Sequence, residues 1–292
     1  MNPSEPHPLD IGLLQQWRGK TERRTDTVTA APLAAMAATL DRDEPPSGPA
    51  VPPLWHWLFF TPQPRQSEIG PDGHAKRGGF LPPVPLPRRM WAGGRLEFLQ
   101  PLHVGDQIIR DSRIVKVDAK PGRSGELVFV TVQHEISNAH GVALTEEHDI
   151  VYRDMPAPGA PPPTPQAAPS DPSFSREIVP DAVLLFRYSA LTFNAHRIHY
   201  DRPYVTQVEG YPGLIVHGPL IATLLADLLR RAHLDAQPHA TLRRFAFTAM
   251  RPLFDIHAFT LCGRIEPDAR NVTLWARDHE GFLAMQAKAE LA

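Results

Sequence analysis

The segment from residue 186 to residue 220 gathers the side chains best suited to acid–base chemistry. It reads FRYSALTFNAHRIHYDRPYVTQVEGYPGLIVHGPL and shows neither the alternation of a strand nor the regular period of a helix. Its histidine, aspartate, tyrosine and arginine residues lie just before a glycine that opens a helical pattern. The first N–H groups of a helix have no partner within it, so they can stabilise a developing oxyanion. The pattern predicts an active site from Phe193 to Gly218, centred on His199, although a single histidine taken alone is more often structural.

Helices and strands must position this segment. His217-Gly218-Pro219 precedes leucine or isoleucine at positions 220, 221, 224, 225, 228 and 229, which form one helical stripe. This spacing predicts a long helix with Gly218 at its N-cap and Pro219 at its first position, ending near the basic pair 230–231. An alanine-rich helix is expected over residues 30–40, capped by Asp26 or Thr27. Runs rich in β-branched residues predict strands at 96–98, 107–117, 127–136 and 142–152, and again at 244–250, 258–265, 271–277 and 282–291.

Helix and strands occur twice in the same order, which predicts an α+β protein with two similar halves. Residues 155–172 read MPAPGAPPPTPQAAPSDP, a proline-rich stretch that cannot pack a core and is expected to be an extended linker. We therefore expect one domain at 1–154 and another at 173–292. A weak internal repeat agrees: residues 100–102 (QPL) correspond to 251–253 (RPL), and 130–132 (VTV) to 272–274 (VTL).

Composition and charge exclude several classes of partner. The formal net charge is −2 and no long basic run occurs, so neither nucleic acid nor an anionic membrane surface is expected to bind. The single cysteine, Cys262, excludes an intramolecular disulfide, and the N-terminus lacks the regions of a signal peptide. No apolar run reaches the roughly 20 residues of a membrane span. We expect a cytoplasmic protein acting on a small molecule, with no metal, since the 14 histidines show no ligand spacing.

Two motifs in the active segment resemble those of a known family. Residues 194–201 (NAHRIHYD) are similar to the D-x-N-P-x-H-x-D motif of the MaoC-like (R)-specific enoyl-CoA hydratases and hydroxyacyl-thioester dehydratases. Residues 215–220 (IVHGPL) are similar to their I-x-H-G-x-L helix start. The sequence around these two motifs most resembles the two-domain branch that includes the mesaconyl-C4-CoA and itaconyl-CoA hydratases. In the first half, the residues MWAGGRLEF resemble the degenerate N-terminal domain of that branch. The resemblance implies a double hotdog fold, in which two antiparallel β-sheets are each wrapped around a central helix.

The resemblance also implies catalytic roles. His199 aligns with the catalytic histidine and would carry the proton transfers, because an imidazole titrates near neutral pH. Asn194 stands where the family has an aspartate; a neutral amide cannot accept a proton as a carboxylate does, so Asn194 would orient the water. Asp201 would fix the imidazole or supply a second carboxylate, unless it is a solvated or capping group. The backbone N–H of Gly218 would polarise the thioester carbonyl.

The implied reaction is the reversible hydration of a short unsaturated acyl-CoA. Mesaconyl-C4-CoA or itaconyl-CoA, giving citramalyl-CoA, is the leading substrate, and no cofactor is expected beyond the CoA of the substrate itself. The free carboxylate of these substrates predicts an arginine in the pocket. Arg197 and Arg251 are candidates for it, with Tyr200 and His217 as further substrate contacts. The remaining arginines that could reach the pocket are Arg88, Arg89 and Arg202.

Two other functions stay open. One is a 3-hydroxyacyl-thioester dehydratase of fatty-acid metabolism, with a longer apolar pocket and a docking surface for acyl carrier protein. The other is a non-catalytic acyl-thioester binder, which the neutral Asn194 makes conceivable; His199, Asp201 and the His-Gly helix start argue against it. The two halves can pair their sheets within one chain, and a homodimer of the whole chain is a further option.

Overall fold

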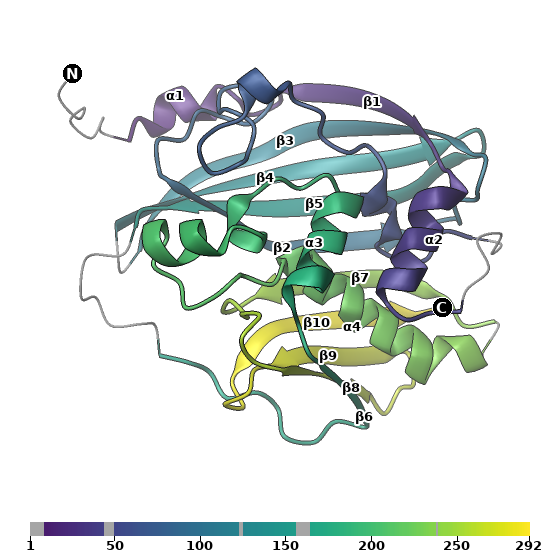
Figure 1. Ribbon diagram of the computed structural model, residues 1–292. Helices are drawn as coiled ribbons and strands as arrows, with labels where there is room; N and C mark the ends of the chain where they lie inside the picture. Colours follow the sequence, from purple (N-terminus) through teal and green to yellow (C-terminus); the bar gives the residue numbers. More distant parts are fainter. Residues whose placement is uncertain (1–8, 44–49, 123–124, 156–163, 238) are drawn as a thin grey trace.

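Ten strands form one antiparallel sheet in the computed structural model, which describes residues 9–43, 50–122, 125–155, 164–237 and 239–292 (Figure 1). The strand order is β1-β3-β4-β5-β2-β7-β10-β9-β8-β6. The first half contributes β1 (Thr21–Thr27), β2 (Arg88–Phe98), β3 (Gln107–Gly122), β4 (Gly125–Asn138) and β5 (Gly141–Arg153). The second half contributes β6 (Phe174–Ile178), β7 (Leu242–Ala249), β8 (Phe259–Ile265), β9 (Asn271–Arg277) and β10 (Leu283–Leu291).

The two halves of the sheet have the same order when they are followed outward from the middle. β2, β5, β4, β3 and β1 on one side correspond to β7, β10, β9, β8 and β6 on the other. The repeated triplets occupy corresponding places, with 130–132 on β4 and 272–274 on β9. The hairpins after β4 and β9 also turn at glycines with positive φ, Gly141 at 112° and Gly281 at 89°. The repeat in the sequence is therefore a repeat in the structure.

The halves join edge to edge at β2 and β7, so the two expected sheets form one continuous surface. Gly93 pairs with Thr248 at this seam, and a Cβ atom on Gly93 would lie 2.5 Å from the carbonyl oxygen of Phe247. Only a glycine allows two backbones to approach this closely. Leu96 and Phe245 pair at the same seam and are buried in a core that the halves share.

Helices α2 (Ala30–Thr39), α3 (Ala182–Leu191) and α4 (Gly218–Ala232) lie on one face of the sheet (Figure 1). Every residue of α4 from Leu220 to Leu229 is buried, and the helix contacts β8, β9 and β10 as well as β2 of the other half. α4 begins one residue earlier than predicted, with His217 at the N-cap and Gly218 at the first position. The long apolar stripe thus places the start of α4 beside the seam between the halves.

Several elements were not predicted from the sequence. They are the short helix α1 (Ile11–Gln15), α3 and the two outermost strands, β1 and β6. The predicted cap of α2 was wrong: Thr29 is the N-cap, without a side-chain hydrogen bond, and Asp26 instead accepts from the N–H groups of Thr27 and Phe60. The short turns are η1 (Trp55–Leu58), η2 (Gln66–Glu68), η3 (Arg197–His199), η4 (Tyr204–Val208, a π-helical turn) and η5 (Leu234–Ala236).

The predicted linker is only partly described. Residues 156–163 lie outside the described residues, whereas Ala167 forms a β-bridge with Phe282 and Gln166 accepts a hydrogen bond from Leu283. This part of the linker therefore runs against the start of β10. The domain limits at 154 and 173 stay a prediction. Across the described residues, none of the helices has the length and apolar character needed to cross a membrane.

Candidate active site

His199 ends the one-turn helix η3, and its side chain is buried. Its Nδ1 atom lies 2.7 Å from the carbonyl oxygen of Ile215. Because a carbonyl only accepts hydrogen bonds, this contact places the proton on Nδ1 and leaves the lone pair on Nε2. Burial lowers the pKa of His199 to about 4, and the weaker effect of the bond to Ile215 opposes it. The imidazole is therefore neutral at pH 7 and can accept a proton through Nε2.

His217 stacks on His199, with ring centroids 3.7 Å apart and an angle of 19° between the rings. Its Nε2 lies 2.8 Å from Oγ of Ser189 on α3. The other nitrogen, Nδ1, is buried and has no hydrogen-bond partner among the described residues. Burial, followed by the charges of neighbouring histidines, lowers the pKa of His217 far below its usual range. A neutral imidazole nitrogen without a partner, next to the start of α4, is a place where a polar atom of a ligand or a water can bind.

Gly218 is the first residue of α4 and is only partly covered. A Cβ atom at this position would meet only the carbonyl oxygen of Trp91, at 3.9 Å. The helix start thus offers an N–H group at its positive end, close to the stacked histidines. Trp91 belongs to an aromatic cluster from both halves, in which its ring lies 4.9 Å from that of Trp57 and 5.9 Å from that of Phe247.

Asn194 and Tyr200 hold the loop that carries His199. The Oδ1 atom of Asn194 accepts a hydrogen bond from the backbone N–H of His196 at 3.0 Å. The backbone N–H of Asn194 donates to the carbonyl of Ser189 at 2.8 Å. The hydroxyl of Tyr200 donates to the carbonyl of Ala195 at 3.1 Å, while the ring is largely exposed. Both contacts are local to the loop. The role of Asn194 towards water and that of Tyr200 towards substrate stay predictions.

Asp201 does not fix the imidazole of His199, and this expected role was wrong. Its Oδ2 accepts two hydrogen bonds from Arg197, at 2.8 and 2.9 Å, and its Oδ1 accepts the N–H of Tyr204 at 3.0 Å. The carbonyl of Ile215 takes the place that Asp201 was expected to fill. Asp201 thus caps the turn at Tyr204, as in the alternative left by the sequence, and its role as a second carboxylate stays a prediction.

The two arginines expected to bind substrate both have carboxylate partners. Arg197 pairs with Asp201 and lies over the Tyr204 ring at 4.1 Å. Arg251 pairs with Asp278 at 2.7 Å and lies over the Phe282 ring. Binding of a substrate carboxylate by either arginine would require breaking these ion pairs. Both assignments stay predictions.

Arg89 on β2 differs from these two arginines. It is half-buried, hydrogen bonds to the hydroxyl of Tyr152 on β5 and has no ion pair with a carboxylate in the described part of the chain. Its positive charge is among the causes that lower the pKa of His74 and of His196, after burial in both cases. Arg89 thus places a guanidinium near the histidines, and its side-chain partner in the described part of the chain is a neutral one.

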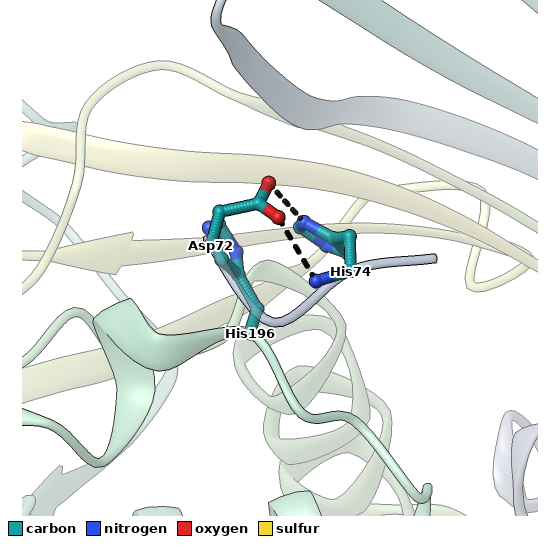
Figure 2. Close-up of side chains that lie close together, drawn as sticks. All are labelled: Asp72, His74 and His196. Carbon is teal, nitrogen blue, oxygen red and sulfur yellow. Dashed lines mark hydrogen bonds and ion pairs between the residues drawn. The ribbon is translucent and has the colours of Figure 1, made fainter. Parts of the chain in front are cut away.

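A loop of the first half packs directly onto the loop of His199. Asp72 accepts two hydrogen bonds from His74, one from the ring Nδ1 and one from the backbone N–H, both at 3.0 Å. The His74 ring lies 3.9 Å from that of His196 (Figure 2). The His196 ring in turn lies 5.5 Å from that of His199. Gly73, with φ of +91°, fits so closely that an added Cβ atom would lie 1.8 Å from the carbonyl oxygen of Ala195.

These three residues were missed in the sequence. Asp72, His74 and His196 each offer one donor atom, and the three donor atoms lie within 4.8 Å of one another, which no other cluster among the described residues matches. They could hold a divalent ion, although Asp72 and His74 already satisfy each other by hydrogen bonding. His196 lies inside the motif and could have been noted there. Asp72 and His74 lie more than a hundred residues away, in the glycine-flanked segment GPDGH, and only the fold brings them to the site.

The order of the strands and the histidine site define a class of protein before any comparison. Two similar half-sheets joined edge to edge, helices on one face and a His-Gly helix start are the features expected of a double hotdog hydratase or dehydratase. The chain belongs to the family hydroxyacyl-thioester dehydratase type 2, which matches residues 54–255. The resemblance stated from the motifs is thereby confirmed.

Similarity to individual proteins agrees with this family assignment. The chain is 47% identical to mesaconyl-C(4)-CoA hydratase of Chloroflexus aurantiacus over 281 residues, which covers 94% of this chain and 96% of that protein. A MaoC-like dehydratase of Phytophthora capsici superposes with a TM-score of 0.65 at 15% identity, covering 97% and 99% of the two chains. A Mycobacterium tuberculosis protein described as a double hotdog superposes with a TM-score of 0.55 at 15% identity, covering 94% and 96%. The double hotdog fold is confirmed.

Proposed function

We propose that the chain is a hydro-lyase that adds water reversibly to the double bond of a short unsaturated acyl-CoA. The observation that carries this proposal is the His199 ring, which keeps the lone pair of its Nε2 atom and stacks on His217, the residue before the first N–H group of α4. One group accepts a proton and the other stabilises negative charge, which are the two requirements of water addition to an enoyl thioester. No cofactor is needed for this chemistry beyond the CoA of the substrate.

The proposed reaction begins with a water held beside His199. Nε2 takes a proton from the water as its oxygen bonds to the β-carbon, and the electron pair of the double bond moves towards the thioester carbonyl. The N–H of Gly218 donates to the resulting enolate oxygen, with the helix dipole adding to its effect. The proton on His199 then passes to the α-carbon, so that water has been added and the imidazole is neutral again. The reverse sequence is dehydration.

We further propose a dicarboxylic acyl-CoA, with mesaconyl-C4-CoA as the first choice and itaconyl-CoA as the second, giving citramalyl-CoA. The high identity to a hydratase of that name supports this choice, as does Arg89, whose guanidinium has no acidic partner among the described residues. A bidentate pair between a guanidinium and a carboxylate gives both strength and orientation. Arg89 therefore takes precedence over Arg197 and Arg251 as the group that binds the free carboxylate.

Hydratase assays on mesaconyl-C4-CoA, itaconyl-CoA and crotonyl-CoA test the reaction. We expect His199→Ala to lower kcat/KM by about 10²- to 10⁴-fold, the usual contribution of a general acid–base group. His103→Ala, which changes an exposed histidine in the loop after β2, is the control and is expected to leave the rate unchanged. Comparable turnover by His199→Ala would contradict the assignment. No turnover of any of the three thioesters by the wild type would contradict the proposed reaction and leave the dehydratase of longer thioesters and the binding function.

The substrate class has its own test in Arg89→Gln. Loss of a charged hydrogen-bonded pair is worth about 1.5 to 3 kcal/mol, or roughly 10- to 150-fold in kcat/KM for the dicarboxylic thioesters. Crotonyl-CoA lacks the second carboxylate and serves as the internal control, since its kcat/KM is expected to stay the same. An equal loss of kcat/KM on all three substrates would show that Arg89 does not bind the free carboxylate. Wild-type preference for a long 3-hydroxyacyl thioester would favour the dehydratase alternative.

A further inference from the structure

The two halves differ in the segment that precedes β2 and β7, the strands that join them. In the second half the buried helix α4 lies between α3 and β7, whereas the described residues between α2 and β2 contain only the short turns η1 and η2. Side chains from residues 54–60 enter the core of the first half there. Within this segment Trp57 is the one residue that is not buried. Aromatic side chains that stay partly exposed beside a core are typical of the walls of ligand pockets.

A second tryptophan, Trp91, connects Trp57 with the start of α4. The two ring centroids lie 4.9 Å apart, and the carbonyl oxygen of Trp91 would lie 3.9 Å from a Cβ atom on Gly218. Trp91 is also partly exposed, whereas Phe247, whose ring lies 6.1 Å from that of Trp57, is buried. The two tryptophans are therefore the accessible part of an aromatic cluster beside the proposed oxyanion donor.

A buried carboxylate holds the Trp57 ring in place. Nε1 of Trp57 donates to both carboxylate oxygens of Glu146 on β5, at 3.1 and 3.2 Å, and Oε2 of Glu146 lies 3.1 Å from Nε2 of His56. Burial opposes the charge of Glu146, but the hydrogen bond and the charge of His56 outweigh it and lower the pKa of Glu146 to about 2. The proposed reaction does not use this carboxylate. Because a hydrogen bond to an ionised acceptor is stronger than one to a neutral acceptor, the indole ring is firmly held.

We propose that Trp57 is the specificity-determining residue that limits the length of the acyl chain. In the proposed function the thioester carbonyl lies at Gly218, so the acyl chain begins beside Trp91. Carbon atoms added to a short chain need further apolar space there, and the fixed ring of Trp57 occupies it. The inference rests on the proposed hydratase function and adds the class of substrate, a short acyl chain instead of the long chain of a fatty-acid dehydratase.

The test is Trp57→Ala in the full chain, assayed on mesaconyl-C4-CoA, trans-2-hexenoyl-CoA and trans-2-octenoyl-CoA. The measured quantity is the kcat/KM of each longer thioester divided by that of mesaconyl-C4-CoA, so that a general loss of activity cancels. We expect the wild type to discriminate against both longer thioesters, and more strongly against octenoyl-CoA. In Trp57→Ala the ratio for hexenoyl-CoA is expected to rise by about 10- to 15-fold, the value of two newly buried methylene groups.

Trp17→Ala is the matched control. Trp17 is also partly buried, and its indole N–H donates to the carbonyl of Gly79 at 3.3 Å, but it packs on a separate core of the first half. We expect Trp17→Ala to leave both ratios unchanged. Denaturant midpoints check the folding of each variant. Trp57→Leu, which keeps an apolar side chain without the ring, replaces Trp57→Ala if that variant does not fold, and its ratio is expected to rise by a smaller factor.

Three results would overturn the inference. They are a wild type that hydrates octenoyl-CoA as fast as mesaconyl-C4-CoA, a folded Trp57 variant with the wild-type ratio for hexenoyl-CoA, and a rise of the same size in Trp17→Ala. A wild type that is inactive on the short thioesters would instead contradict the proposed function, so the two failures are distinguishable.

Discussion

Gly73→Ala should separate the first-half loop from the active site. A Cβ atom at Gly73 would lie 1.8 Å from the carbonyl oxygen of Ala195 and 2.8 Å from its carbonyl carbon. Real Cβ atoms essentially never approach within 3.0 Å, so the two backbones would have to move apart by at least 1.2 Å, the difference between 3.0 and 1.8. The atom in the way belongs to the backbone and cannot turn aside as a flexible side chain does.

A displacement of this size is large for a catalytic site. Misplacement of reacting groups by ~1 Å can cost about 10²-fold in rate, and here the loop that moves carries His74 against His196. The positive φ of +91° adds about 1 to 2 kcal/mol of strain for any residue other than glycine. We therefore expect kcat/KM to fall by about 10²-fold, together with a loss of stability.

Gly78→Ala is the matched control for Gly73→Ala. Gly78 lies in the same loop with the same φ of +91°, but an added Cβ atom would meet only the side chain of Pro83, at 3.7 Å. Both variants carry the strain of about 1 to 2 kcal/mol, and only Gly73→Ala carries the clash. Hydratase assays and denaturant unfolding of the pair measure the two effects separately. If both variants kept wild-type kcat/KM, the contact between the halves would not matter for the reaction, and the reasoning would be refuted.

Two further predictions concern stability. Burial lowers the pKa of His148 to about 3 and of His134 and His199 to about 4. As the pH falls through 6.5, the unfolded chain binds protons that the folded chain does not. The free energy of unfolding is therefore highest above pH 6.5 and falls towards pH 4. Well below pH 6.5 each such histidine adds a slope that approaches about 1.4 kcal/mol per pH unit. Urea unfolding at pH 6.5, 5.5 and 4.5 should therefore show a slope smaller by up to that amount in His148→Gln. Asp227 on α4 is fully buried among three arginines, so Asp227→Asn should cost about 3 to 5 kcal/mol. Asp111→Asn, at an exposed ion pair, should cost at most ~1 kcal/mol, and equal midpoints for the two variants would contradict this.

Local patterns in the sequence predicted most of the fold. The leucine stripe of α4 and the apolar runs of eight strands are properties of neighbouring residues, and these elements were found close to their predicted places. The exception is β2, which begins at Arg88, eight residues before the predicted start. β1 was missed because its sequence, TERRTDT, is charged, and it lies at the edge of the sheet with no residue fully buried. Helix α3 was missed because most of its ten residues are exposed or half-covered, so no clear stripe appears.

The candidate site was predicted only where its residues are close in sequence. His199, His217 and Gly218 lie within one segment, and the structure brings them together. The sequence could not predict the ion pairs of the arginines. Asp278, for example, pairs with Arg251 from the turn between β9 and β10. Asp72 lies still further away along the chain. Contacts of this kind depend on the packing of the two halves, which no local pattern encodes.

Because β2 and β7 join the halves edge to edge, we expect that neither half of this chain can be separated from the other as a stable domain. A fragment beginning near residue 173 would keep the histidine motif but would expose β7 as a free edge strand, with Phe245 and Phe247 uncovered. Such edges pair with other chains and aggregate. Expression of the second half alone is therefore a poor route to a smaller enzyme, and any attempt to transplant the site would have to carry both halves.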